Sequence, residues 1–275
     1  MATVVSGYSA SSDSLVRFRS GYIKAIAKAW SDPSYQDSFC SKENILDWEE
    51  FNKLLPEGKK LPWSAQVKII TREGKDVSGF NTQTRWMPGP TAGWFGADDG
   101  FVVNLPPAPT DEKDYAEALA TYNQMFPTIL GLDANKEKDE SSADGIDEDF
   151  TNFGCVLLQA IALCWATKDV DPKNNETNKP NFESLLVENG VEALSSFFGF
   201  NNPWNFKITF VHSSSSENKA SWNDSQKKWD NLYNKVLLNY PVAPAGNSDF
   251  SEEKMKIVAL GSYNACGMYY PFTCA

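Results

Sequence analysis

The chain carries Ala25-Ile26-Ala27-Lys28-Ala29-Trp30 near its start and repeats this block in its second half as Ala160-Ile161-Ala162-Leu163-Cys164-Trp165. Three further blocks recur in the same order and with nearly the same separation between their two occurrences. They are Pro62-Trp63 with Pro203-Trp204, residues 104–109 with residues 239–244, and Leu119 and Tyr122-Asn123 with Leu260 and Tyr263-Asn264. Because order and spacing are both kept, we interpret the chain as two tandem copies of one unit.

Each copy shows the same succession of hydrophobic patterns. It opens with apolar residues at helical spacing, over residues 14–31 in the first copy, and a shorter helical pattern follows. The spacing then changes to two, over residues 63–69 and 204–210, which is typical of a strand with one face in a core. A second strand, at 101–103 or 236–238, ends at prolines, and a last helix follows. We therefore expect an α+β fold of two tandem repeats, each a helical hairpin, a small antiparallel sheet and a C-terminal helix.

An acidic stretch separates the two copies. Residues 133–149 hold eight acids and two lysines, and such a polar run buries too little surface to order itself. We expect repeat unit 1 at residues 1–132, the linker at 133–149 and repeat unit 2 at 150–275. A calcium loop is disfavoured in the linker, because Lys138 stands where that loop requires glycine.

Composition argues against several partners and sites. A net charge of −11 disfavours nucleic acid and anionic membranes, since both need a basic patch. No apolar run approaches the roughly 20 residues of a membrane span, and no secretory signal is visible, so we expect a cytoplasmic protein or leaderless export. One histidine, His212, and five cysteines without tight spacing give no triad, zinc or disulfide pattern. We predict no catalytic, cofactor-binding or metal-binding residues.

Two groups of residues resemble known peptide precursors. Ser31-Asp32-Pro33 after Trp30, Val67-Lys68-Ile69 and the proline-rich stretch 103–109 are similar to the nitrile hydratase-like leader of some bacterial modified-peptide precursors. The C-terminal stretch Tyr270-Pro271-Phe272-Thr273-Cys274 resembles the end of thiazole/oxazole-modified microcin precursors, which typically finish Tyr-Pro-Phe-Thr-Cys-Cys.

The resemblance implies a leader that directs enzymes to cyclise Cys, Ser or Thr of a core peptide onto the preceding amide carbonyl. It implies Cys266, Thr273 and Cys274 as modification sites. The chain departs from the pattern, because it ends in Ala275 and because residues 126–129 of the first copy contain no cysteine. It also lacks the Cys-x-x-Cys-Ser-Cys metal claw of nitrile hydratase, so we reject hydratase activity.

Three functions stay open at this point. The sequence favours a non-enzymatic, self-assembling structural protein, the subunit of a filament, tube or sheet, because head-to-tail contacts generate open assemblies. Trp86, Trp94, Trp222 and Trp229 are its candidate contacts, unless their loops fold back on their own core. The alternatives are a bacteriocin-like precursor with modifying enzymes as partners, and a small-molecule binding module with a cleft between the units.

Overall fold

A computed structural model describes residues 13–32, 34–35, 45–56, 61, 65–70, 85–87, 93–95, 99–126, 129–130, 148–169, 181–204, 207–212 and 219–265. The first copy contains α1 (Asp13–Ser31), α3 (Trp48–Asn52), β1 (Gln66–Ile70), β2 (Arg85–Met87), β3 (Gly93–Phe95), β4 (Gly100–Leu105), the 3-10 helix η1 (Glu112–Asp114) and α4 (Tyr115–Met125). The second contains α5 (Glu148–Ala166), α6 (Phe182–Phe198), β5 (Lys207–His212), β6 (Ser221–Asn223), β7 (Lys228–Asp230), β8 (Lys235–Asn239) and α7 (Glu252–Ala265). The expected α+β class is confirmed.

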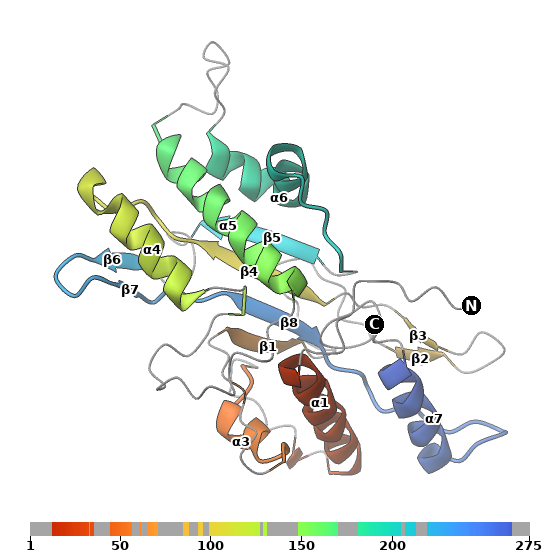
Figure 1. Ribbon diagram of the computed structural model, residues 1–275. Helices are drawn as coiled ribbons and strands as arrows, with labels where there is room; N and C mark the ends of the chain where they lie inside the picture. Colours follow the sequence, from red (N-terminus) through yellow and green to blue (C-terminus); the bar gives the residue numbers. More distant parts are fainter. Residues whose placement is uncertain are drawn as a thin grey trace.

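The two copies build one four-stranded sheet together, which corrects the expectation of a small antiparallel sheet in each unit (Figure 1). The strand order is β1-β8-β4-β5. The central strands β4 and β8 are antiparallel, whereas β1 runs parallel to β8 and β5 parallel to β4. Each copy therefore pairs its first long strand with the second long strand of the other copy. Alternation along a strand shows which face is buried and leaves its pairing partner undetermined.

The register of the sheet shows that this exchange is symmetric. Gln66 lies opposite Lys235 across β1 and β8. The repeat alignment makes Lys207 the counterpart of Gln66 and Gly100 the counterpart of Lys235. Lys207 lies opposite Gly100 across β5 and β4. The pair Lys207–Gly100 is therefore the counterpart of the pair Gln66–Lys235, with the two copies in exchanged roles. The arrangement is that of an isologous dimer whose two subunits are joined in one chain.

The centre of this pseudo-dimer lies at Phe101 in β4 and Val236 in β8. The two residues are each other's repeat counterparts and face one another across the sheet. Both side chains are fully buried, and Phe101 makes edge contacts with Phe150 and Trp204 of the second copy. The buried side chains of both copies form one main cluster, so the halves share an interior and do not each close around their own.

One tryptophan of each copy forms the same hydrogen bond to the other copy. Trp30 in α1 donates its indole N–H to the carbonyl of Pro241, and Trp165 in α5 donates to the carbonyl of Pro106. Both distances are 2.9 Å, and both contacts are buried. The repeated Ala-Trp block of one copy is thus the partner of the proline-rich block of the other. Prolines end the strands and leave carbonyls that a buried indole can use.

The helical hairpins expected at the start of each copy are present, since α1 packs on α3 and α5 on α6. In α1, Gly21 allows the close approach, because a Cβ there would meet Phe51 and Leu55 at 2.8 Å. Trp204 is buried as expected, stacked on Phe150 at 4.5 Å between ring centroids, whereas Trp63 lies outside the described residues.

One described helix is long and apolar enough to cross a membrane by length and composition alone. It is α5, over residues Asp149–Ala166, and half of that window is buried inside the protein. Phe153, Ile161 and Trp165 on this helix belong to the shared core. Its apolar character is therefore accounted for by packing against α4 and α6.

Candidate functional site

The four candidate assembly tryptophans lie on two short hairpins where the sequence indicated irregular loops. Trp86 pairs with Trp94 across β2 and β3, and Trp222 pairs with Trp229 across β6 and β7. Strands of three residues are too short to show a period. The two hairpins could have been predicted from the similar spacing of the two tryptophans in each copy. Aromatic residues paired across two strands stabilise a hairpin.

The β6–β7 hairpin of the second copy is anchored on the first copy. Trp229 is 4% exposed, and its indole N–H donates to the carbonyl of Ala118 in α4 at 2.9 Å. Its ring lies 5.9 Å from Trp165 and 5.4 Å from Trp222. Figure 1 shows the hairpin beside α4. Trp229 is therefore an interface anchor, but the interface is between the two copies of one chain.

The β2–β3 hairpin has the reciprocal position. β3 packs against α7 of the second copy, and the indole N–H of half-buried Trp86 points at the sulfur of Met255 at 3.3 Å. The side chain of Trp94 is outside the described part of the structure. These contacts occupy Trp86 and Trp229 within the molecule, and any use of Trp94 or Trp222 between molecules stays a prediction.

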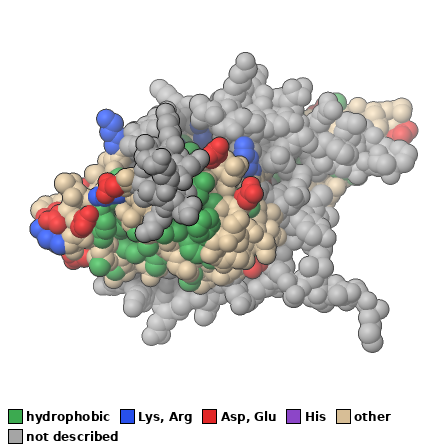
Figure 2. All heavy atoms as spheres, turned by 90° about the horizontal axis from the view of Figure 1, so that it is seen from above, with side chains coloured by type: hydrophobic (Ala, Val, Ile, Leu, Met, Phe, Trp, Pro, Cys, Tyr) green, Lys and Arg blue, Asp and Glu red, His purple; other side chains and the backbone are tan. Residues whose placement is uncertain are grey.

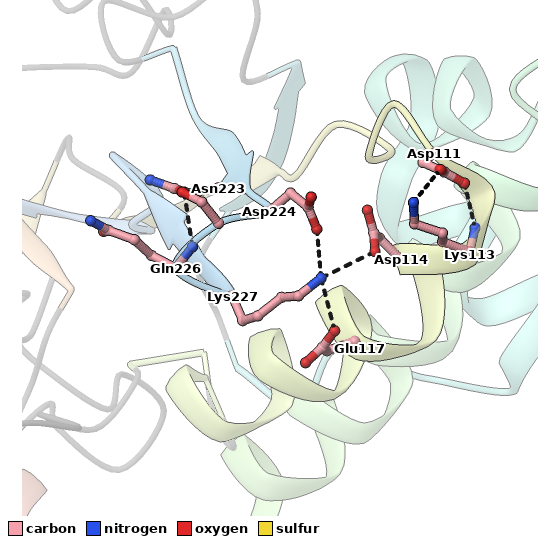
Figure 3. Close-up of polar contacts among 9 residues, drawn as sticks. Asp111, Lys113, Asp114, Glu117, Asn223, Asp224, Gln226 and Lys227 are labelled. Carbon is pink, nitrogen blue, oxygen red and sulfur yellow. Dashed lines mark hydrogen bonds and ion pairs between the residues drawn. The ribbon is translucent and has the colours of Figure 1, made fainter.

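A cluster of charges ties the β6–β7 hairpin to the start of α4 (Figure 3). The Nζ of Lys227 lies 2.5 Å from Asp224, 3.3 Å from Asp114 and 3.3 Å from Glu117. The hydrogen bond with Asp224 raises the pKa of Lys227 and lowers the pKa of the Asp224 carboxyl. Lys227 has a positive φ of 49° in the turn before β7. The cluster links Lys227 of the second copy with Asp114 and Glu117 of the first.

His212, the single histidine of the sequence, lies at the end of β5, with its Nδ1 2.6 Å from the Oε1 of Glu183 in α6. Burial, and second the charge of Glu183, raise the pKa of the thiol of Cys164. A buried thiol held protonated is a poor nucleophile. Among the described residues, no group of three or more His, Cys, Asp or Glu side chains could hold a metal ion.

The residues implied as modification sites lie C-terminal to the last described helix. α7 ends at Ala265, so Cys266 is the next residue, and Cys266, Thr273 and Cys274 all lie outside the described residues. α7 packs against α1 and β3. The helix that precedes the C-terminal segment is thus supported by the first copy.

The equivalent segment of the first copy, after α4, is built into the core. Phe126, Ile129 and Leu130 are all at most 5% exposed. The carbonyl of Ile129 accepts from the side chain of Asn234 at 3.2 Å, and that of Leu130 accepts from the backbone N–H of Ala65 at 3.0 Å. This segment therefore has a structural role in the shared core.

Comparison with known proteins matches the two copies separately. A family model described as "ribosomal natural product, two-chain TOMM family" matches residues 13–130 and again residues 148–271, which together make up most of the chain. TOMM stands for the thiazole/oxazole-modified microcins whose precursors the C-terminal residues resemble. No curated protein and no solved structure matches the chain. The double match bears out the tandem duplication.

Proposed function

The chain belongs to the two-chain TOMM family of ribosomal natural products, and from this membership we propose that it is a modified-peptide precursor or a direct derivative of one. The two copies, as far as the structure describes them between residues 13 and 265, act as a duplicated leader-like scaffold. Residues 266–275 are the segment that modifying enzymes act on, and those enzymes are its partners. The alternative hypothesis from the sequence thereby takes precedence over self-assembly.

The proposed reaction is cyclisation at Cys266, Thr273 or Cys274. The side-chain sulfur or oxygen attacks the carbonyl carbon of the preceding residue and forms a new bond to it. The carbonyl oxygen leaves as water with the side-chain proton and the amide proton, and a C=N double bond replaces the C=O bond. Each ring formed therefore lowers the mass of the chain by one water. Among the described residues we identify no side chains that would catalyse this cyclisation. We therefore propose that separate enzymes carry it out.

The observation that supports this assignment concerns the segment after α4, which is the first copy's counterpart of the C-terminal segment. In the first copy the segment after α4 is buried, with Ile129 and Leu130 hydrogen-bonded into the core. A buried, hydrogen-bonded backbone is closed to an enzyme that must reach both a side chain and a carbonyl. Only the second copy ends in the Tyr-Pro-Phe-Thr-Cys sequence of residues 270–274. Both copies build the fold, and in this proposal the second copy also carries the segment that is modified.

Self-assembly receives less support, because Trp229 and Trp86 contact the other copy within the same chain. A cytoplasmic site of modification, followed by leaderless export, remains part of the proposal as its cellular setting.

The test is the intact mass of the chain isolated from its native producer, followed by peptide mapping. We expect a mass deficit of one or more waters, confined to residues 266–275 and reduced by Cys274→Ala. Cys155→Ala, at an exposed position on α5, is the matched control and should leave the deficit unchanged. A native mass equal to that of the unmodified chain, or a deficit elsewhere in the chain, would refute the proposal.

A further inference from the structure

The helix α7 carries apolar side chains on its outer face. Of the four large apolar residues that are exposed in the described part of the chain, three lie on α7 or just before it, namely Phe250, Ile257 and Val258. Ile257 is 72% exposed and Val258 is 44% exposed. One turn further on, a Cβ added at Gly261 would meet no atom within 4 Å, so this face stays accessible toward the C-terminal end of the helix.

The equivalent helix of the first copy, α4, has the same pattern of burial with different residues at the exposed positions. Ala118 and Ala259 are repeat counterparts, and both are fully buried. The two residues just before them are exposed in each helix, and they are Ala116 and Glu117 in α4, and Ile257 and Val258 in α7. Because the fold accepts alanine and glutamate at these positions in α4, packing within the chain does not account for isoleucine and valine in α7.

Charge changes along α7 in the same direction. The charged residues of this helix lie in its first turn and a half, which ends with Lys256, paired with Glu252 and Glu253. Residues 257–275 contain no Asp, Glu, Lys, Arg or His, although the whole chain has a net charge of −11. The exposed apolar face of α7 therefore adjoins, in the sequence, the uncharged segment 266–275. Exposed apolar surface of this kind marks a place where another molecule binds.

The fourth exposed apolar residue, Phe197 in α6, lies elsewhere. Its ring is 50% exposed and makes an edge contact with the ring of Phe182, with 4.9 Å between the ring centroids. α6 is at the top of Figure 1 and α7 at the bottom. Figure 2 looks from above onto the side that carries α6, where hydrophobic side chains gather among charged and other polar ones. Phe197 is thus a control for the effect of an exposed apolar side chain far from α7.

The position of α7 along the chain indicates which molecule binds there. Ile257 lies eight residues before Ala265, the last residue of α7, which is about 12 Å along the helix axis. Cys274 lies nine residues beyond Ala265 and is therefore at most about 30 Å from it. A single domain of ordinary size is about 30–40 Å across. An enzyme that acts on Cys266, Thr273 or Cys274 can therefore contact Ile257 with the same domain.

A second copy of this chain is a poor occupant of the surface. A stable dimer buries about 800 Å² on each partner, which is more than two adjacent aliphatic side chains provide. The net charge of −11 on each copy also opposes association of like copies. A transient contact between an enzyme and its substrate needs a smaller buried area.

We propose that Ile257 and Val258 of α7 form a docking surface for an apolar patch of the enzyme that modifies residues 266–275. This inference rests on the proposed function and adds to it the place where the enzyme holds its substrate. Ile257 is the main contact because it is the more exposed of the two. α7 packs against α1 and β3, so the two side chains stand on a supported helix. Docking there raises the effective concentration of the segment 266–275 at the enzyme.

The test produces the wild-type chain and the double variant Ile257→Ala/Val258→Glu together in the native producer. The variant carries the residues that the first copy has at these positions. The two chains compete for the same enzyme, so the ratio of their modified fractions, read from intact mass, reports their relative kcat/KM. We expect the variant to be modified roughly tenfold less, because burial of one aliphatic side chain of this size changes a binding constant by about ten- to a hundredfold. Phe197→Ala is the matched control and should be modified like wild type.

A competitor separates docking from the cyclisation itself. The variant Cys266→Ala/Thr273→Val/Cys274→Ala keeps α7 unchanged and has no side chain in residues 266–275 that can be cyclised. When it is overproduced beside wild type, we expect it to lower the modified fraction of wild type. The same competitor with Ile257→Ala/Val258→Glu added should leave that fraction unchanged.

Equal modification of wild type and the double variant would overturn the inference and leave the proposed function intact. An unmodified wild type would instead refute the proposed function, and the inference with it. If the competitor has no effect although the double variant is poorly modified, the surface acts on its own chain, and docking of an enzyme is refuted. A wild-type dimer that the double variant converts to monomers in native mass spectrometry would identify a second copy as the occupant and overturn the inference as well.

Circular dichroism of each purified chain checks that it is folded. Ile257→Gln, a single change at the more exposed position, is a second variant that should lower modification in the same direction. A folded Ile257→Gln chain that is modified as well as wild type would contradict the role of Ile257 as the main contact.

Discussion

Replacing Trp165 by phenylalanine should destabilise the whole chain, because this side chain joins one copy to the other. Trp165 is 4% exposed, and its indole N–H is the partner of the buried Pro106 carbonyl at 2.9 Å. Phenylalanine leaves that carbonyl without its donor, at a cost of about 1–3 kcal/mol. The smaller ring also loses part of the packing on Trp229 and Tyr115, which adds about 1 kcal/mol.

The expected total for Trp165→Phe is therefore about 2–4 kcal/mol, or a fall in Tm of roughly 5–15 °C for a chain of this size. Trp30→Phe should cost a similar amount, since its contact with Pro241 has the same geometry. Differential scanning calorimetry measures both variants. Each should shift one common transition, because the two copies share one sheet and one core.

The matched control for this pair is Trp222→Phe. The indole nitrogen of Trp222 is buried and has no hydrogen-bond partner among the described residues. Removing an unsatisfied donor should change stability by less than about 1 kcal/mol, in either direction. If Trp165→Phe destabilises the chain no more than Trp222→Phe does, the proposed role of Trp165 in joining the two copies is refuted. The same holds if Trp165→Phe lowers the Tm of only one of two separate transitions.

Three further predictions concern other contacts. Gly190→Ala should destabilise the chain by about 1–3 kcal/mol, because its Cβ would meet the Phe210 ring. Gly261→Ala in α7 has open space around it and should stabilise the chain by about 0.5–1 kcal/mol. Urea denaturation measures both variants, and equal effects on stability would contradict the close contact between Gly190 and Phe210. Lys227→Met should weaken the chain most near neutral pH. The lowered pKa of Asp224 gives stability that is present above its usual value of 3.8 and lost as pH falls through and below it, so the difference from wild type should shrink on acidification, and a constant difference would disprove the charge cluster. A thiol reagent followed by peptide mass mapping should label exposed Cys155 in the native chain and buried Cys164 only after unfolding. Labelling of Cys164 in the native chain would contradict the protection of its thiol by the core.

Local structure was largely predictable from sequence because it depends on spacing between near neighbours. The pattern over residues 14–31 predicted α1 (Asp13–Ser31), and that over 101–103 predicted the middle of β4. The second helix of each copy was expected to be the shorter one, whereas α6 has 17 residues. It begins at Phe182, where Asn181 caps the helix by accepting the N–H of Ser184.

Pairing between the copies was not predictable, because the same alternation in each copy fits either partner equally well. β1 and β8 come from opposite ends of the chain and pair in parallel, and no local signal in the sequence specifies that choice. The same limit applied to the tryptophans. Their aromatic side chains in expected loops suggested contact anchors, but whether Trp229 contacts another molecule or Ala118 of its own chain depends on that pairing. Modification at Cys274 was indicated only by resemblance, and it remains the proposed function.

The interleaving of the two copies is tested most directly by cutting the chain between them. A specific protease site placed within residues 133–147 of the full chain would separate the copies covalently, and native mass spectrometry would follow the products as denaturant is added. We expect the two fragments to stay together in one particle and to unfold in one transition, since each completes the other's sheet. Two folded fragments that separate and unfold independently would contradict the shared fold.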